Sequence, residues 1–164
     1  MATIIVEDGS GLTTSNSYVT EAEVSTWATD RGITLTDTVA VLIIKGMDYL
    51  ETLFYIGDKY TEAQALQWPR DGVVIDDFLI ERETIPNELK DAQLALCMTL
   101  DSGGDDFDPM GILERSTKKE KVGDIEVEYK DGSASREIPI SVNRFLQKLI
   151  KDGTSGTGFN VSRG

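Results

Sequence analysis

The side chains most able to do chemistry in this sequence are four clustered carboxylates, those of Asp101, Asp105, Asp106 and Asp108. Oxygen ligands in that number could hold a divalent cation. The spacing of a calcium-binding loop is not met, because a loop starting at Asp101 has Asp106 where the sharp turn needs glycine and Ile112 where the bidentate glutamate belongs. We therefore expect neither a bound metal nor a cofactor.

Other catalytic arrangements are excluded or weak. The chain contains no histidine, so Ser-His-Asp and Cys-His nucleophile systems and histidine-bearing zinc sites cannot be built as usual. Asp76 and Asp77 are adjacent, and in an extended segment their carboxylates would point apart. Cys97 lies on the apolar stripe of an expected helix and is predicted to be a small core residue. We expect that the protein is not an enzyme.

Charge is distributed unevenly along the 164 residues. Residues 1–112 hold 6 basic and 21 acidic side chains, whereas residues 113–164 hold 10 basic and 8 acidic ones. An acidic body repels phosphate and gives no electrostatic footprint for nucleic acid, although acidity can also serve solubility alone. The apolar runs are too short for a membrane span or a signal peptide, so we expect a cytosolic protein when made and no membrane partner.

Helices are expected where apolar residues recur at helical spacing and capping signals precede them. Thr20 and Glu23 form a capping box, Pro86 suits a first helical turn, and Ser141 is the expected N-cap of the last helix. The predicted helices cover residues 21–31, 39–54, 61–67, 86–100 and 141–152.

The helix over residues 39–54 is expected to be central, because its apolar residues keep helical spacing over four turns. Gly46 on the same face is expected to allow close approach of a neighbouring helix. Six residues should be buried together in the core: Trp27, Leu42, Met47, Leu50, Trp68 and Leu96.

Shorter extended segments complete the expected body. Residues 2–7 are rich in β-forming types and stop at the turn cluster 8–11, which predicts a short N-terminal strand. Residues 69–72, Pro-Arg-Asp-Gly, have the order of a tight turn. Residues 73–75 and 78–80 are expected to be short extended or irregular packing segments around Asp76 and Asp77.

A β-hairpin is predicted around Gly123-Asp124, a two-residue loop with glycine first. Counting outward places Lys121 opposite Glu126, Lys119 opposite Glu128 and Lys118 opposite Tyr129. The face that carries Tyr129 holds too many charged residues to be buried in a core and too many apolar residues to be simply exposed to solvent. We therefore expect a projecting hairpin that docks on a partner through residues Lys118, Lys119, Lys121, Glu126, Glu128 and Tyr129.

The last eleven residues, 154–164, are rich in Gly, Ser and Thr and cannot order themselves. They form either a frayed terminus or an arm that orders on a partner through Phe159, Val161 and Arg163. The fold class expected from the whole sequence is mainly α: a small helical bundle with a protruding antiparallel β-hairpin, a short N-terminal strand and an extended C-terminal arm. The expected parts are a helical body (1–112), the hairpin (113–131), a C-terminal segment with the final helix (132–153) and the tail (154–164).

A set of short motifs carries a resemblance that covers about residues 4 to 150. They are Val6-Glu7-Asp8-Gly9-Ser10-Gly11, Asn16-Ser17-Tyr18-Val19-Thr20, Met47-Asp48-Tyr49-Leu50, Leu66-Gln67-Trp68-Pro69-Arg70-Asp71-Gly72, Ile85-Pro86, and Lys121-Val122-Gly123-Asp124-Ile125-Glu126-Val127-Glu128-Tyr129. In their order and spacing they resemble the head-to-tail connector family of tailed phages, the neck adaptor or head-completion proteins, whose members are also described as DnaT-like single-stranded-DNA-binding proteins.

The resemblance implies a structural virion protein at the phage neck. Such adaptors form a ring beneath the portal, expected to follow its twelvefold symmetry, and extend the DNA channel toward the tail. The implied partners are further copies of the chain, the portal protein, a downstream stopper or tail-completion protein, and genome DNA that passes without specific binding. The resemblance carries over no catalytic residue.

A single-stranded-DNA-binding replication module is the alternative. That role needs a basic groove with stacking aromatic side chains. The only basic and aromatic cluster evident in the sequence combines Lys118, Lys119 and Lys121 with Tyr129, and glutamates at 120, 126 and 128 interleave it. We therefore expect the adaptor role and keep single-stranded-DNA binding as the alternative.

Overall fold

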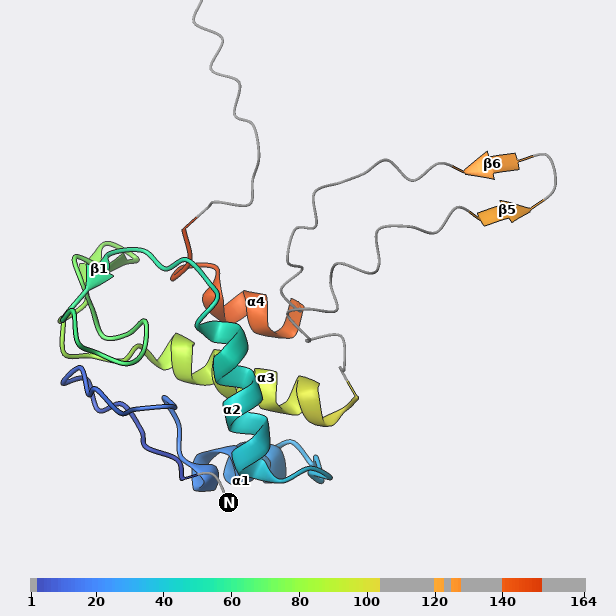
Figure 1. Cartoon of the computed structure of the whole chain (residues 1–164), viewed down its shortest axis with the longest axis horizontal. Helices are drawn as coiled ribbons and strands as arrows, with labels where there is room; N and C mark the ends of the chain where they lie inside the picture. The colour runs from blue at the N-terminus through green and yellow to red at the C-terminus, as the bar shows by residue number, and fades with distance from the viewer. Residues whose placement is uncertain (1–2, 104–119, 123–124, 128–139, 152–164) are drawn as a thin grey trace, which may run out of the picture.

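The computed structural model describes residues 3–103, 120–122, 125–127 and 140–151. This part of the chain is mainly helical, as predicted, with short strands that pair two by two in antiparallel fashion (Figure 1). The helices are α1 (Glu21–Asp30), α2 (Val39–Leu50), α3 (Asn87–Asp101) and α4 (Ile140–Leu146). The strands are β1 (Asp58–Lys59), β2 (Arg70–Asp71), β3 (Val74–Ile75), β4 (Phe78–Leu79), β5 (Glu120–Val122) and β6 (Ile125–Val127).

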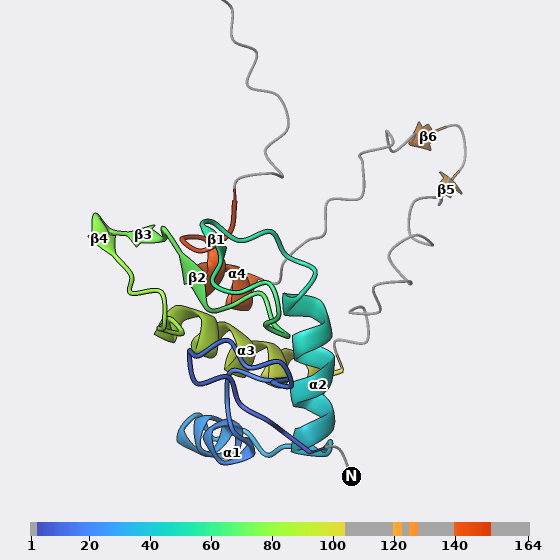
Figure 2. The same ribbon diagram turned by 60° about the vertical axis from the view of Figure 1, so that its left-hand side comes forward.

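Helix α3 is the centre of the bundle, with α4 on one side of it and α1 on the other (Figure 2). Its sequence explains this position, because its apolar residues cover most of its circumference. Buried along it are Leu89, Ala92, Gln93, Leu94, Ala95, Leu96 and Cys97. The prediction of a helix buried on most sides, with Cys97 in the core, is confirmed.

The core is divided into two clusters along α2. Met47 and Leu50, from its C-terminal half, join Trp68 and Leu96 in the larger cluster. Leu42, from its N-terminal half, belongs to a second cluster against which Trp27 is only partly buried. The expectation that six residues pack together is therefore wrong in part, because the two halves of α2 contribute to different clusters, one that Trp27 of α1 packs against and one that contains Trp68 and residues of α4.

Helix α1 begins at the predicted residue and ends at Asp30, one residue earlier than predicted. The Thr20 hydroxyl accepts a hydrogen bond from the backbone N–H of Glu23 at 3.1 Å, and the Glu23 carboxylate accepts one from the N–H of Thr20 at 2.6 Å. These two bonds satisfy donors that the first helical turn leaves unpaired. Gly32, with φ of 66°, follows the last turn and reverses the chain.

Helix α2 ends at Leu50, four residues earlier than predicted. The chain leaves the helix because residues 54–56 pair with the segment after α4: Lys151 N–H donates to the Phe54 carbonyl at 2.8 Å, and Ile56 N–H donates to the Leu149 carbonyl at 2.9 Å. Phe54 is consequently 79% exposed instead of lying on the buried stripe.

Gly46 was expected to permit close approach of a neighbouring helix, and it faces α3. A Cβ atom added there would lie 3.6 Å from Leu96 Cδ2, which is ordinary van der Waals contact. Because glycine is unfavourable inside a helix, we predict that Gly46→Ala raises the free energy of unfolding by about 0.5–1 kcal/mol. Urea denaturation measures this change, and a loss of stability would show that α2 and α3 need the glycine.

The predicted helix over residues 61–67 is wrong, although its capping contacts form. Gln64 N–H donates to the Thr61 hydroxyl at 3.1 Å, and Thr61 N–H donates to the Gln64 side chain at 2.8 Å. The Gln64 amide nitrogen also donates to the carbonyl oxygens of Leu66 and Pro69, at 2.9 and 3.0 Å. These bonds hold the segment as a loop in which Gln64 and Leu66 are buried.

The short strands correct three further expectations. Arg70 and Asp71 lie in β2 paired with β1, where a tight turn was predicted. Asp76 and Asp77 form the two-residue turn between β3 and β4, with φ of 50° and 67°, where extended backbone was expected. The N-terminal strand is reduced to a single parallel bridge between Val6 and Ser17.

The register predicted for the later hairpin is confirmed where the structure describes it, since Lys121 pairs with Glu126 and Val122 with Ile125. The remainder of the predicted hairpin, and the predicted tail 154–164, lie outside the described residues. Ser141 lies within α4 and is therefore not its N-cap. Helix α4 packs on α3 and buries Val142 and Leu146, so residues 140–151 share the core of the helical body.

Candidate functional site

The Trp-Pro-Arg motif, residues 68–70, is buried in the fold and is not exposed on the surface. Arg70 is only 7% exposed, and its guanidinium donates to the backbone carbonyls of Ile56 at 2.7 Å, Gly57 at 2.6 Å and Gln67 at 3.1 Å. Trp68 is fully buried beside it, and its peptide bond to Pro69 is cis. Arg70 thus ties two loops together.

A hydrogen-bonded group formed by Tyr18 and by Glu51, the residue that follows α2, supports the same motif. The Tyr18 hydroxyl donates to the Glu51 carboxylate at 2.9 Å, which also accepts the N–H of Gln67 at 3.1 Å. Trp68 N–H donates to the Tyr18 hydroxyl at 3.2 Å. Burial raises the pKa of Glu51, and burial together with the nearby Glu51 charge raises the pKa of Tyr18 well above its usual value.

Glu51 should give the protein a distinctive pH dependence. A carboxyl whose pKa is higher in the folded than in the unfolded state holds its proton more tightly when folded, so its contribution to stability is lost as pH rises above the ordinary 4.5. We predict that Glu51→Gln, which is always neutral, gains stability relative to wild type between pH 4 and pH 7. Urea melts at both pH values test this, with exposed Glu62→Gln as the control. The prediction would be contradicted if the difference in free energy of unfolding between Glu51→Gln and wild type were the same at pH 4 and pH 7.

The N-terminal motif is likewise structural. The buried Glu7 carboxylate accepts the N–H groups of Gly9, Gly11 and Leu12 at 2.9–3.0 Å and the Ser15 hydroxyl at 2.8 Å. Both of its oxygens are occupied by the chain's own donors. The carboxylate therefore shapes the loop over residues 9–15 and offers no free ligand atoms.

The predicted carboxylate cluster is described only at Asp101. Its carboxylate accepts the N–H groups of Thr36 and Asp37, both at 2.8 Å, and these bonds lower its pKa. Asp105, Asp106 and Asp108 lie outside the described residues. Within the described ranges, no three Asp, Glu, Cys or His side chains gather as metal ligands do.

The Cys97 thiol agrees with its prediction as a core residue. It is fully buried, and burial raises its pKa to about 12. A thiol in that state has little nucleophilic thiolate.

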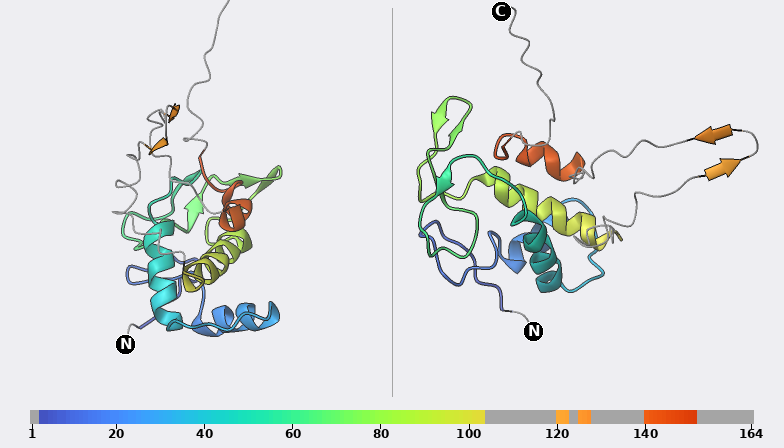
Figure 3. Two further views of the ribbon diagram at one scale, coloured as in Figure 1. Left: turned by 90° about the vertical axis from the view of Figure 1, so that its right-hand side faces the viewer. Right: turned by 45° about the horizontal axis from the view of Figure 1, so that its top comes forward.

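An exposed apolar surface is found on the hairpin formed by β3 and β4, which projects beside the end of α4 (Figure 3). Val74 and Leu79 pair directly across it and are 53% and 70% exposed, and Phe78 is 74% exposed. A solvated hairpin face normally carries polar side chains. At the turn, the Asp76 carboxylate lies 2.6 Å from Lys148 Nζ. Apolar side chains presented in this way are typical of a docking surface.

A second surface combines arginines with aromatic rings, and we call it the aromatic row. The Trp27 and Phe145 rings meet edge to face, with centroids 6.4 Å apart. The Arg31 guanidinium lies 3.4 Å from the Trp27 centroid, and that of Arg144 lies 4.5 Å from the Phe145 centroid. Asp91 is their acidic neighbour, and burial raises its pKa against the lowering effect of both arginines.

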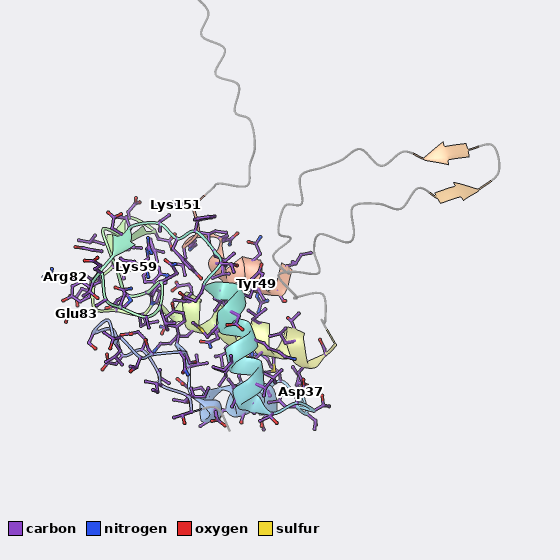
Figure 4. All side chains as sticks on the ribbon, in the orientation of Figure 1. Asp37, Tyr49, Lys59, Arg82, Glu83 and Lys151 are labelled. Atoms are coloured by element: carbon purple, nitrogen blue, oxygen red, sulfur yellow. The ribbon has the colours of Figure 1, made fainter. Side chains whose placement is uncertain are left out.

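A third cluster has its charges balanced locally. The Tyr60 hydroxyl donates to the Glu83 carboxylate at 3.0 Å, and the Arg82 guanidinium lies 5.7 Å from the Tyr60 ring centroid. Figure 4 shows Arg82 and Glu83 with Lys59 over the loops, at the opposite end of the molecule from Asp37. Acidic and basic side chains lie next to each other in this cluster, so it forms neither a positive nor a negative patch.

The interaction residues predicted from sequence are only partly reached by the structure. Lys121 and Glu126 are paired through their backbones, and nothing further is described of their side chains. The others lie outside the described residues: Lys118, Lys119, Glu128, Tyr129, Phe159, Val161 and Arg163. Their docking role stays a prediction.

Sequence reasoning missed both described surfaces. The spacing of Trp27 and Arg31, one helical turn apart, was readable, but the contact with Phe145 joins opposite ends of the chain and leaves no local signal. The exposure of Phe78 and Leu79 follows from the turn at Asp76 and Asp77, where the usual Asn-Gly signal is absent.

No helix among the described residues has the length and apolar character needed to cross a membrane. No curated protein and no solved structure matches the chain. A family model described as "Putative DnaT-like ssDNA binding protein" matches residues 2–164, which is nearly the whole chain. The chain therefore belongs to this DnaT-like family.

Proposed function

We propose that the protein is a structural adaptor of the phage neck and not an enzyme. In this role, copies of the chain form a ring beneath the portal in the virion, and the ring extends the DNA channel toward a stopper or tail-completion protein. The observation that carries the proposal is the β3–β4 hairpin, whose apolar residues Val74, Phe78 and Leu79 are all more than half exposed. Such a surface suits contact with another protein.

The charge of the body supports the same role. Residues 1–112 carry 21 acidic against 6 basic side chains, and a channel wall of that character repels DNA phosphates. Repulsion between the acidic wall and the DNA phosphates would let the genome pass through the channel without binding to it. The motifs that carry the resemblance also support a structural role. The charged groups of Glu7 and Arg70 form hydrogen bonds with backbone groups of the same chain.

Single-stranded-DNA binding is a second candidate, and the aromatic row favours it together with the family's description. Aromatic rings beside arginines offer stacking to bases and attraction to phosphates. Trp27 and Phe145 are partly buried, while Arg31 and Arg144 are exposed. Asp91 and the acidic body oppose phosphate binding at the same place.

Two measurements separate the candidates. Fluorescence anisotropy with a labelled oligonucleotide should show weak binding for an adaptor, whereas tight, salt-sensitive binding that Arg144→Ala weakens would favour the DNA-binding module. Incorporation into particles should fall for the double variant Phe78→Ser, Leu79→Ser and persist for Val41→Ser, an exposed apolar residue on α2. Equal incorporation of both variants would contradict docking through the hairpin.

A further inference from the structure

The tip of the β3–β4 hairpin presents a carboxylate next to apolar side chains. Asp76 and Asp77 both have positive φ, which fixes the two-residue turn and the direction of the residues that follow. The Asp76 carboxylate is held by Lys148, whereas Asp77 has no ion-pair partner among the described residues. Val74 and Leu79, which pair across the hairpin, share one exposed apolar face next to Asp77, while Phe78 lies on the other face opposite Ile75.

The aromatic row presents the opposite chemistry. Arg31 and Arg144 are exposed and lie over ring faces, and neither has a carboxylate oxygen within 4.0 Å in the described part of the chain. A stacked guanidinium keeps its edge N–H groups in a fixed fork that matches a carboxylate. The row therefore suits a partner that brings a carboxylate and apolar side chains.

Helix α4 places the hairpin tip and the aromatic row along one side of the molecule. Lys148, which contacts Asp76 at 2.6 Å, lies four residues after Arg144, just beyond the end of α4. One surface therefore has an acidic, apolar end at the hairpin and a basic, aromatic end at the row. A surface whose two ends complement each other can bind a copy of itself turned by 180°, as in the isologous contacts of twofold dimers.

We propose that two copies of this chain associate about a twofold axis, with the β3–β4 hairpin of each copy lying on the aromatic row of the other. Asp77 pairs with the partner copy's arginine, and Val74 and Leu79, which share one face of the hairpin, cover the edge of its ring pair. The inference concerns the protein alone and does not rest on the adaptor role. In an adaptor, the pairing would also hide the docking hairpin until a stronger partner displaces it.

The first test is the mass of the full chain in solution. Sedimentation equilibrium from about 1 μM to about 1 mM covers the affinities expected of a modest interface. The average mass should rise from the monomer value of 18.0 kDa to twice that value and stop there. A monomer at the highest concentration overturns the proposal, as does growth beyond two copies, which would mean a head-to-tail contact.

The second test is a charge exchange between the two ends. Asp77→Lys and Arg144→Glu should each weaken association at least about tenfold, because each places like charges at both reciprocal contacts. An equimolar mixture of the two variants should associate nearly as well as wild type, because one contact is then Lys with Glu and the other is native. Neither variant by itself should recover this association.

Lys45→Glu and Asp48→Lys are matched controls on the exposed face of α2, and their association should equal that of wild type. Circular dichroism melts check that each variant folds, and Arg31→Glu replaces Arg144→Glu if the latter does not. Variants that associate like wild type, or a mixture without rescue, overturn the contact. Either result leaves the adaptor role to be decided by particle incorporation.

Discussion

Leu50→Ala is expected to lower the free energy of unfolding by about 2–5 kcal/mol, the usual cost of removing a large buried side chain. Leu50 is completely buried in the larger core cluster, where Trp68 and Leu96 are its fellow members. These neighbours belong to α3 and to the loop held by Arg70, so a cavity at this place cannot close by the movement of one element. Urea denaturation measures the loss.

Val41→Ala is the matched control for Leu50→Ala, since both positions lie on α2 and Val41 is 43% exposed. Its effect should stay within about 0.5 kcal/mol. If Leu50→Ala left the midpoint of unfolding unchanged, Leu50 would not be the core residue that its burial indicates.

Gly9→Ala should be similarly damaging, through backbone rather than cavity effects. A Cβ atom at this position would overlap the carbonyl oxygen of Glu83 and lie 2.8 Å from its carbonyl carbon. The φ of 103° is also one that residues with a side chain rarely adopt. Steric overlap and conformational strain together should cost about 2–5 kcal/mol.

Gly32→Ala separates the two causes. Gly32 has φ of 66°, but a Cβ atom there would meet nothing within 4 Å. Its substitution should therefore show the conformational cost alone, about 1–2 kcal/mol. Equal losses at positions 9 and 32, measured by thermal unfolding, would contradict a close contact between the N-terminal loop and residue 83.

Elements defined by local signals could be predicted from the sequence. The capping box at Thr20 and the apolar stripe around Leu96 each determine a helix through neighbours within one or two turns. The two-residue loop expected from the sequence at Gly123-Asp124 predicted the register in which β5 and β6 pair, because such a loop leaves one pairing pattern.

Features that depend on distant contacts could not be predicted. Helix α2 stops early because Phe54 pairs with Lys151 near the other end of the chain. The Thr61 capping box starts no helix because Gln64 binds carbonyls beyond it. The aromatic row joins Trp27 to Phe145, and neither residue's local sequence indicates the other.

The late position of α4 in the chain has a consequence for biosynthesis. Val142, Leu146 and Leu149 complete the larger core cluster, yet they are made well after Leu89 and Leu96, which belong to the same cluster. At about 5–20 residues per second, the ribosome needs a few seconds to proceed from residue 103 to residue 151. During that interval the nascent chain displays one uncovered side of α3, which is a natural substrate for a chaperone. Completion of the larger core cluster must then wait until residues 142–149 have been translated.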